Sequence, residues 1–528
     1  MASLGIDILG DFGTDRRRID GRRIFIFAAV FSIFAPLCLY TINLGVTGQG
    51  GRNRAVPAAS AQILRADIVD RNGEILAKNI YSFDAVMNAR QIKNADRAAA
   101  FVHSVFPDIS VNDVLEKIGT GKGRIEIKKD IGRETAAVIR DEKIDGLTAV
   151  PKQVRKYPRG NSTSHIVGFV GKDDEGIEGI ELFANERLKN VPDPLVLSID
   201  ARIQSVMWAD LSAAMKEYKA RAAIGALMNA RTGEILAAVS IPDYDPENIN
   251  SSPGGNRTSR FRFYNYEMGS IFKIFNTALA LSHGMPTTKT FNVVDPFVIA
   301  GKPVGEARGF RPPAKNLNVA QIMQYSSNSG SAQIALSLPD GAQADFFREL
   351  FFDRPIDTDF GTTEKTGFPG SFTPTDRSRW SFGQGISVTP LHALLAANAI
   401  VNDGKYIMPT IYRRDFVPNT RQVVSKDVSK RVRQIMLKVM DTSGRAAATQ
   451  IRGMNIGGKT STAQKFIDGK YSDTKNITAF FAAFPIEAPK WSMLIMMDEV
   501  ETFPRTAAHN VVPVAGKIMN AIIQMLQQ

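Results

Sequence analysis

The chain has 528 residues, of which 44% are hydrophobic and 22% are charged, a composition typical of a folded protein with two or three domains. Its net charge is +12, but Lys and Arg are interspersed with Asp and Glu and form no long basic run, which argues against nucleic-acid binding. The single cysteine, Cys38, excludes an intrachain disulfide, and the five histidines lack metal-site spacing, so we expect neither a metal nor another cofactor.

Residues 24–46 are the first predicted element, a run of 23 residues without a charge. At about 1.5 Å per residue, a helix of this length spans the roughly 30 Å hydrocarbon core of a membrane. Arginines precede the run at positions 16–18, 22 and 23, and only Arg52 and Arg54 follow it closely, so the positive-inside rule places residues 1–23 in the cytoplasm. The alternative is a cleaved signal peptide, whose apolar core is usually only about 7–15 residues long. We therefore expect a retained single-pass transmembrane helix.

The next region, residues 47–190, begins with a linker rich in Gly, Arg and Ala. Two apolar runs then flank Asn72 and Gly73, a pair typical of a β-hairpin with a type I′ turn. Charged residues interleaved with Ala, Val, Ile and Leu predict helical structure over residues 92–145, and residues 155–188 are richer in glycine and turns. Two prolines within residues 190–194 discourage helix, so we expect a domain boundary there.

Residues 191–528 combine strand and helix patterns. We expect a strand over residues 195–199, an amphipathic helix over 201–219 and two strands within 222–240. Closer to the C-terminus, apolar runs predict strands over residues 477–484 and 491–497 and a last helix over 514–526. Strands at both ends of the region with helices between them predict one α+β domain built on an antiparallel sheet.

The first chemical motif is Ser-x-x-Lys at residues 270–273. A helix that begins near Gly269 would place Ser270 and Lys273 on one face, and its first N–H groups would suit a developing oxyanion. Lys273 could then remove the proton that makes a serine hydroxyl a poor nucleophile. This spacing also arises by chance, and a capping serine beside a solvated lysine is the alternative.

Two further motifs follow. Residues 325–330 could present the Ser326 hydroxyl and the Asn328 amide to one pocket, although a polar loop explains this motif equally well when it is taken alone. Residues 456–465 predict a strand that carries a second cation, Lys459, and several hydroxyls. Residues 453–460 formally match a phosphate-binding loop, but no buried apolar strand precedes them, as such a loop requires.

Ser-x-x-Lys, Ser-x-Asn and Lys-Thr-x in this order are the signature of penicillin-recognising serine enzymes, and the chain resembles the class B penicillin-binding proteins over nearly its whole length. Outside the three motifs, the similarity lies at residues 65–77, 155–160, 165–169, 179–181, 232–237 and 382–385. The resemblance implies an elongated, non-catalytic pedestal domain over residues 47–190 and a penicillin-binding transpeptidase domain over residues 191–528. It also implies an inner-membrane protein whose catalytic domain lies in the periplasm.

The resemblance assigns catalytic roles to four residues. Ser270 is expected to attack the carbonyl that joins the two terminal D-alanines of a peptidoglycan stem peptide, with Lys273 as the base. Ser326 would relay the proton to the leaving D-alanine, and Lys459 would set the local potential. An acceptor amine from a neighbouring stem peptide would then resolve the acyl-enzyme.

The resemblance also implies a substrate-binding group. Asn328 would hold the peptide amide, and Thr460 and Thr462 would bind the terminal carboxylate. The backbone N–H groups of Ser270 and Thr462 would form the oxyanion hole. Ser461 stands between the two threonines where the family usually has glycine, and its Cβ and hydroxyl would narrow the approach of a substrate to this strand.

Several features most resemble the division-specific, FtsI-type branch, with the elongation-specific branch as the alternative. Expected partners are stem peptides and nascent glycan strands, β-lactams as covalent inhibitors, a membrane-embedded glycosyltransferase and other division proteins. Two other classes remain open. A lactam sensor or hydrolase would need a base that activates water near Ser270, and we identify none; a catalytically weak scaffold is the second.

Overall fold

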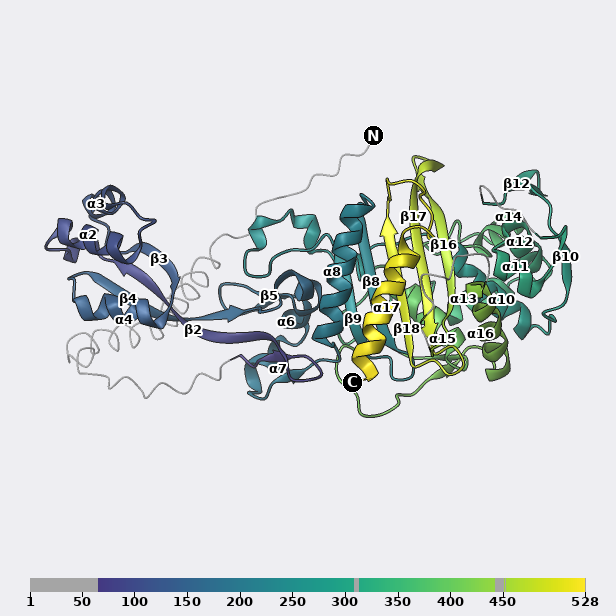
Figure 1. The fold of residues 1–528 in the computed structure, drawn as a ribbon, viewed down its shortest axis with the longest axis horizontal. Coiled ribbons are helices and arrows are strands. Elements are labelled where there is room, and N and C mark those ends of the chain that lie inside the picture. The colour runs from purple at the N-terminus through teal and green to yellow at the C-terminus, as the bar shows by residue number, and fades with distance from the viewer. Residues whose placement is uncertain (1–64, 308–312, 442–450, 452, 528) are drawn as a thin grey trace, which may run out of the picture. The chain divides into compact units, whose positions relative to one another are not determined.

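The computed structural model describes residues 65–307, 313–441, 451 and 453–527 (Figure 1). The predicted cytoplasmic tail, residues 1–23, and the predicted membrane helix, residues 24–46, lie outside these residues. Among the helices of the described ranges, none combines the length and the apolar character needed to cross a membrane.

The first sheet belongs to the N-terminal region and has the order β3-β2-β1-β7, with β4 also paired to β2. Helices pack on it through a small core that includes Met87, Val102, Val114 and Ile139. Its elements are β1 (Ile68–Val69), β2 (Ile75–Met87), η1 (Ala89–Gln91), α2 (Ala95–Val105), α3 (Val111–Gly119), β3 (Ile125–Ile131), α4 (Arg133–Glu142), β4 (Leu147–Lys156) and β7 (Leu195–Val196).

Two predictions for this region are wrong in part. Residues 92–145 are not helical throughout, because β3 lies among them; it is an end strand that buries Ile127 and Ile131 and exposes most of its charged residues. The strand predicted over 195–199 is limited to Leu195–Val196, and it pairs in parallel with β1. The chain beyond the expected boundary thus contributes to the first sheet.

β1 and β2 form the predicted hairpin, but their turn is not type I′. Within the turn only Gly73 has a positive φ, +88°, whereas a type I′ turn needs two such residues. Instead, the Asp70 carboxylate accepts hydrogen bonds from the backbone N–H groups of Asn72 (2.7 Å) and Glu74 (2.8 Å). The Asp70 side chain therefore organises the turn, and Gly73 supplies its left-handed residue.

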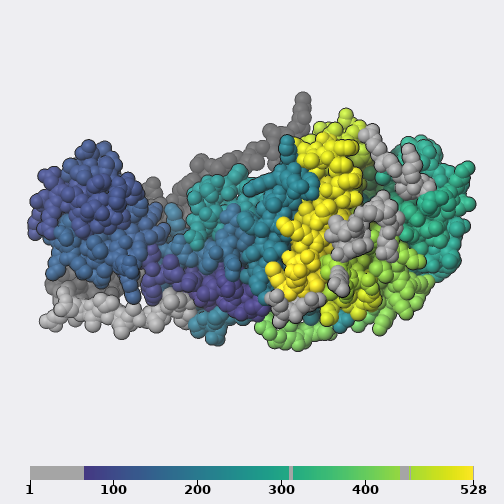
Figure 2. Space-filling model, in the orientation of Figure 1, coloured from purple at the N-terminus to yellow at the C-terminus, as the bar shows by residue number. Residues whose placement is uncertain are grey.

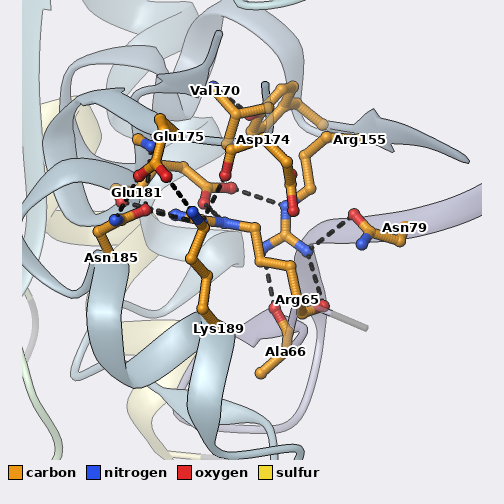
Figure 3. A network of polar contacts seen from close by, with 12 residues as sticks. Arg65, Ala66, Asn79, Arg155, Val170, Asp174, Glu175, Glu181, Asn185 and Lys189 are labelled. Carbon is orange, nitrogen blue, oxygen red and sulfur yellow. Dashed lines mark hydrogen bonds and ion pairs between the residues drawn. The ribbon is translucent and has the colours of Figure 1, made fainter. Parts of the chain in front are cut away.

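A buried ion cluster joins the two ends of this region (Figure 3). The Glu181 carboxylate accepts from Arg65 Nε at 2.6 Å and from Arg155 Nε at 2.7 Å, and all three side chains are at most 2% exposed. Two guanidinium groups thus share one carboxylate. Further N–H groups of the two guanidiniums donate to backbone carbonyls: Arg65 donates to the Glu181 carbonyl, and Arg155 donates to the Ala66 carbonyl. The Glu181 charge is consequently essential to the neutralisation of both arginines.

Short elements surround Glu181 and lead to the second region: η2 (Gly160–Thr163), α5 (Ser164–Val167), β5 (Phe169–Val170), β6 (Gly176–Glu178), α6 (Gly179–Phe183) and α7 (Asn185–Asn190). The second region is residues 191–527, as far as the structure describes them. The hydroxyl of its Tyr244 donates a hydrogen bond to the Glu178 carboxylate at 3.0 Å, and Lys156 donates to the carboxylate of its Glu247 at 2.7 Å. These contacts fasten the first region to the second.

The second sheet has five antiparallel strands in the order β16-β17-β18-β8-β9. They are β8 (Ala222–Asn229), β9 (Ile235–Ile241), β16 (Gly457–Ile467), β17 (Lys470–Phe484) and β18 (Trp491–Asp498). β18 pairs with β8 over its whole length, so strands from the two ends of the domain meet in one sheet. The predicted α+β class, the antiparallel sheet and the strands at 222–240, 477–484 and 491–497 are confirmed.

Helices cover both faces of this sheet (Figure 1). α8 (Ala201–Glu217) and α17 (Val511–Gln527) lie on one face, and α15 (Pro390–Val401) and α16 (Lys426–Asp441) lie on the other with α10 (Phe272–Ser282). Alternate residues of β17 serve the two cores: Phe480 packs with α8 and α17, and Phe481 packs with α10 and α15. Burial on both faces explains why these strands are continuous apolar runs in the sequence.

The final helix, α17, crosses the face shown in Figure 2 in yellow. Its inner side, including Ile518 and Ile522, is fully buried, whereas Lys517 and Asn520 are exposed. The remaining elements are η3 (Ile249–Ser251), η4 (Gly254–Arg257), α9 (Arg260–Phe263), η5 (Gly269–Ile271), β10 (Thr290–Asn292), β11 (Phe297–Ile299), β12 (Lys302–Val304), β13 (Asn316–Asn318), α11 (Val319–Tyr325), α12 (Asn328–Leu336), α13 (Ala342–Glu349), α14 (Pro374–Trp380), β14 (Lys405–Tyr406) and β15 (Arg421–Gln422).

Candidate active site

Ser270 lies in η5, the short 3₁₀ turn that leads directly into α10, and Lys273 lies in the first turn of α10. Lys273 Nζ is 3.0 Å from Ser270 Oγ, and the lysine is only 1% exposed. Aromatic packing fixes the start of the helix, because Phe272 stacks on Phe352. The predicted placement of Ser270 and Lys273 on one helical face is therefore found, and the alternative of a solvated lysine is wrong.

The Ser-x-Asn motif connects α11 to α12 and brings Ser326 and Asn328 to the same place. Ser326 ends α11 with a left-handed conformation, φ +65°, and its Oγ lies 3.0 Å from Ser270 Oγ. Asn328 begins α12, and its Oδ1 accepts from Lys273 Nζ at 2.7 Å. The simple polar loop considered from the sequence is thus part of a hydrogen-bonded cluster.

Oxygen atoms of three described residues, Ser270, Ser326 and Asn328, lie within hydrogen-bonding distance of Lys273 Nζ, and their chemistry indicates how the lysine can act. The two shortest contacts, 2.7 Å each, reach the Ser326 carbonyl and Asn328 Oδ1, which can only accept hydrogen bonds. The Asn328 amide is oriented by its nitrogen, which donates to the Gly305 carbonyl at 3.0 Å. A neutral amine has two hydrogens and one lone pair, so a neutral Lys273 can donate to both acceptors and still accept the Ser270 proton.

β16 supplies the third motif. Lys459 is fully buried, and its Nζ donates to Ser326 Oγ and to the Thr460 carbonyl, both at 3.0 Å. Thr460 is half-buried, and Thr462, two residues further along the same strand, is exposed. The Thr462 hydroxyl accepts from the Ala507 N–H at 3.0 Å, which leaves its own hydrogen able to donate to a ligand.

The position of Lys459 also excludes a phosphate-binding loop. Residues 457–460 are paired with β17, with Lys459 opposite Phe481, so they belong to a strand and do not open a helix. Within the described residues, no group of three or more His, Cys, Asp or Glu side chains is arranged to hold a metal ion.

Ser461 contacts the nucleophile directly. Its Oγ accepts a hydrogen bond from the Ser270 backbone N–H at 2.9 Å, which is one of the two N–H groups expected to form the oxyanion hole. The approach is close because residue 269 is glycine: a Cβ there would lie 2.5 Å from Ser461 Oγ, and Gly269 also has a positive φ of +52°. Ser461 therefore contacts the backbone of Ser270 itself, a contact that the motif pattern alone did not indicate.

Residues 223–524, more than half of the chain, match the penicillin-binding protein transpeptidase domain. The chain belongs to this family. Residues 61–191 match the penicillin-binding protein dimerisation domain. Both matches agree with the resemblance drawn from the three motifs.

Several similar proteins match this chain over most of its length. The probable peptidoglycan D,D-transpeptidase FtsI of Caulobacter vibrioides is 27% identical, over 96% of this chain and 89% of its own length. Stage V sporulation protein D of Bacillus subtilis is 28% identical, over 86% of this chain and 77% of its own length. Penicillin-binding protein 2X from Streptococcus thermophilus shares the fold, with a TM-score of 0.74 at 20% identity, over 88% of this chain and 79% of that chain.

Glu306, which no sequence motif indicated, binds the Ser-x-Asn motif of this penicillin-binding protein through its carboxylate. Its carboxylate accepts from the backbone N–H groups of Asn328 (2.6 Å) and Ser329 (3.0 Å) and from the Ser327 hydroxyl (2.6 Å). A carboxylate at the start of α12 is favoured by the helix dipole. No sequence signal marks this pairing, because Glu306 precedes the motif by about twenty residues in an irregular loop.

Glu267 lies three residues before Ser270, just ahead of η5, the turn that carries the nucleophile. Its Oε1 accepts from the Gly385 N–H at 3.0 Å and from the Tyr471 hydroxyl at 3.3 Å, which ties the nucleophile turn to residues 382–385 and to β17. Burial raises the pKa of Glu267, and these hydrogen bonds oppose part of that rise. The segment 382–385, noted for its family resemblance, thus has a physical task beside the nucleophile.

Proposed function

We propose that the chain is a serine-type peptidoglycan D,D-transpeptidase that cross-links stem peptides through an acyl-enzyme on Ser270. The observation that carries the proposal is the cluster of Ser270, Lys273, Ser326 and Lys459. Its hydroxyl and amine groups lie within 3.0–3.2 Å of one another in a continuous chain. A buried amine beside a serine is the arrangement that activates a hydroxyl as a nucleophile.

In the acylation step, Ser270 Oγ bonds to the carbonyl carbon between the two terminal D-alanines, and its proton passes to Lys273 Nζ. The carbon–nitrogen bond then breaks, and its electron pair stays on the nitrogen of the departing D-alanine. That nitrogen takes a proton from Lys273 through Ser326 Oγ, which lies 3.2 Å from Lys273 Nζ. Lys459 stabilises the Ser326 hydroxyl during this transfer.

In the second step, the amine of an acceptor stem peptide attacks the ester carbonyl, loses one proton and releases Ser270, which regains its proton. Asn328 is proposed to hold the peptide amide, and its Oδ1 also bonds to Lys273. Thr460 and Thr462 are proposed to bind the terminal carboxylate, with the Thr462 hydroxyl as a donor. A penicillin-type lactam would follow the first step only, because its leaving nitrogen stays attached to the acyl group.

We place this activity at the division septum, on a single-pass inner-membrane protein with a periplasmic catalytic domain. The FtsI-named relative supports that placement, and the sporulation relative is the reason for keeping a different cellular role under test. The proposed domains are residues 47–190, a pedestal, and 191–528, the transpeptidase domain. Proposed partners are nascent glycan strands, a membrane-embedded glycosyltransferase and other division proteins.

A fluorescent penicillin tests the enzyme directly. Trypsin would release residues 263–273, a peptide in which Ser270 is the only serine, so a mass increase on it locates the adduct. We expect the adduct in the full-length chain and in the control variant Ser282→Ala, which alters the same helix away from the cluster, and no adduct in Ser270→Ala. Equal labelling of Ser270→Ala would contradict the proposal, and rapid release of hydrolysed drug would favour a lactamase.

Depletion in cells tests the cellular role separately. Loss of a division enzyme leaves growth intact and blocks septation, so filaments are expected. Rounded cells would instead assign the chain to elongation, and normal vegetative cells would contradict both roles.

A further inference from the structure

The nucleophile turn and β16 make one hydrogen bond that the proposed reaction must break. Ser461 Oγ accepts the Ser270 N–H over 2.9 Å, and Ser461 is only 3% exposed. A backbone N–H has one hydrogen and makes one good hydrogen bond at a time. The same hydrogen is required for the oxyanion that forms when Ser270 Oγ attacks a carbonyl.

The oxygen of Ser461 therefore takes the hydrogen bond of the Ser270 N–H that the substrate's oxygen requires. An oxyanion must lie about 2.7–3.1 Å from its donors, and the Ser461 hydroxyl is already within that range of the Ser270 N–H. Two oxygens cannot share this place. The hydroxyl has to rotate to another staggered χ1 position before the tetrahedral intermediate can form.

We infer that Ser461 caps its own enzyme's oxyanion hole and sets the rate of acylation of Ser270, so that substrates and lactams acylate only after displacing its hydroxyl. This inference rests on the proposed function. It makes Ser461 a determinant of reactivity toward any acyl donor whose carbonyl must enter the oxyanion hole, and glycine at this position would remove the cap.

The packing around Ser461 favours the capped state. Gly269 leaves room for the hydroxyl, since a Cβ on residue 269 would clash with it at 2.5 Å and with Ala463 at 2.9 Å. Ser461 is also fixed on β16 by its pairing with Ala479 of β17. Backbone geometry thus holds the Ser461 Cβ beside the nucleophile, and the hydroxyl contacts the Ser270 N–H from there.

Two substitutions separate the hydroxyl from the Cβ. Ser461→Ala removes the oxygen and keeps the Cβ, and Ser461→Gly removes both. Ala463→Gly is the matched control, because it loosens the same strand on the same face without touching the Ser270 N–H. The measured quantity is the second-order rate constant for acylation of the full-length chain by a fluorescent penicillin.

We expect Ser461→Ala and Ser461→Gly to acylate about fivefold faster than the wild type, the effect of one net hydrogen bond, and Ala463→Gly to be unchanged. A peptidyl boronic acid supplies a second readout, because its tetrahedral adduct on Ser270 also places an oxygen in the oxyanion hole. Its inhibition constant should fall by the same factor in both Ser461 variants, a change that altered stability alone would not produce.

Three results would overturn the inference while leaving the proposed function intact. These are acylation of both Ser461 variants at or below the wild-type rate, acceleration by Ser461→Gly but not by Ser461→Ala, and equal acceleration by Ala463→Gly. In each case the wild-type adduct on Ser270 would still be present. Absence of that adduct from every variant would contradict the proposed function, and the inference with it.

Discussion

The amino groups of Lys273 and Lys459 both lie within hydrogen-bonding distance of one hydroxyl, that of Ser326, at 3.2 and 3.0 Å. Lys273 comes from the start of α10 and Lys459 from β16, so the hydroxyl joins a helix and a sheet edge that are far apart in the sequence. Ser326 in turn contacts Ser270 Oγ at 3.0 Å. The two lysines therefore have unequal positions: Lys273 contacts the nucleophile, and Lys459 acts on it through Ser326.

This inequality predicts a graded response to substitution. Lys273→Met keeps the volume and removes the base, so acylation by penicillin should slow by about 10²–10⁴-fold, the usual contribution of general-base catalysis. Lys459→Met should slow it by about 10- to 100-fold, through loss of one charged hydrogen bond. Lys302→Met, at an exposed lysine of the same domain, is the control. A Lys459 variant slower than the Lys273 variant would contradict the assigned roles.

Glu306 is predicted to be a positioning residue. Glu306→Gln keeps the shape but has one oxygen instead of two, so one of the bonds to Asn328, Ser329 or Ser327 is lost. Acylation at saturating penicillin should slow about tenfold, with an unchanged thermal midpoint and partial recovery in Glu306→Asp. Glu364→Gln, at an exposed carboxylate, should behave as the wild type. A lowered thermal midpoint with a normal acylation rate would make the role of Glu306 structural instead.

The ion cluster of the N-terminal region gives a stability prediction. Glu181→Gln should leave Arg65 and Arg155 buried without a countercharge, and the first region should lose about 3–5 kcal/mol of unfolding free energy. Glu116→Gln, at an exposed position of α3, should change it by less than about 0.5 kcal/mol. Denaturant unfolding followed by circular dichroism measures both. Equal stability of the two variants would show that the arginines are neutralised by other groups.

His392 gives a pH prediction for the second region. Burial lowers its pKa from 6.5 to about 4, against a smaller opposing effect of the Arg354 carbonyl at 3.0 Å. As the pH falls, His392 takes up a proton in the unfolded chain before it does so in the folded chain. Its contribution to stability is therefore complete above pH 6.5 and is lost as the pH falls from about 6.5 to 4. Between pH 7 and pH 5, protonation of this histidine should lower the free energy of unfolding by about 2 kcal/mol.

Tryptophan fluorescence reports that loss selectively, since Trp208, Trp380 and Trp491, the chain's three tryptophans, all follow residue 191. The pH dependence of urea unfolding should be shallower in His392→Gln than in the wild type. It should be unchanged in His103→Gln, at an exposed histidine. Identical slopes in His392→Gln and the wild type would refute the assignment.

The sequence was sufficient for the features that a local pattern determines. Continuous apolar runs identified β17 and β18, and the spacing of Ser270 and Lys273 identified their shared helical face. β3 was missed because its alternate charged residues resemble an exposed helix more than an end strand.

Contacts between distant segments were beyond pattern reasoning. The carboxylate of Glu306 and the hydroxyl of Ser461 act on backbone N–H groups, and any residue type presents such a group. Their partners are therefore set by how β16 packs against η5 and how the segment after β12 packs against the start of α12. A departure from the family motif marked Ser461 as unusual, and only the structure gave it a partner.

A natural donor tests directly whether Ser270 carries the acyl group. The full-length chain is incubated with a stem peptide ending in D-alanyl-D-alanine and a labelled D-amino acid acceptor, quenched in acid and digested with trypsin. We predict an acyl adduct on residues 263–273 that lacks one D-alanine of the donor, formation of the labelled exchange product, and neither in Ser270→Ala. Exchange product that persists in Ser270→Ala, or an adduct on another peptide, would contradict it.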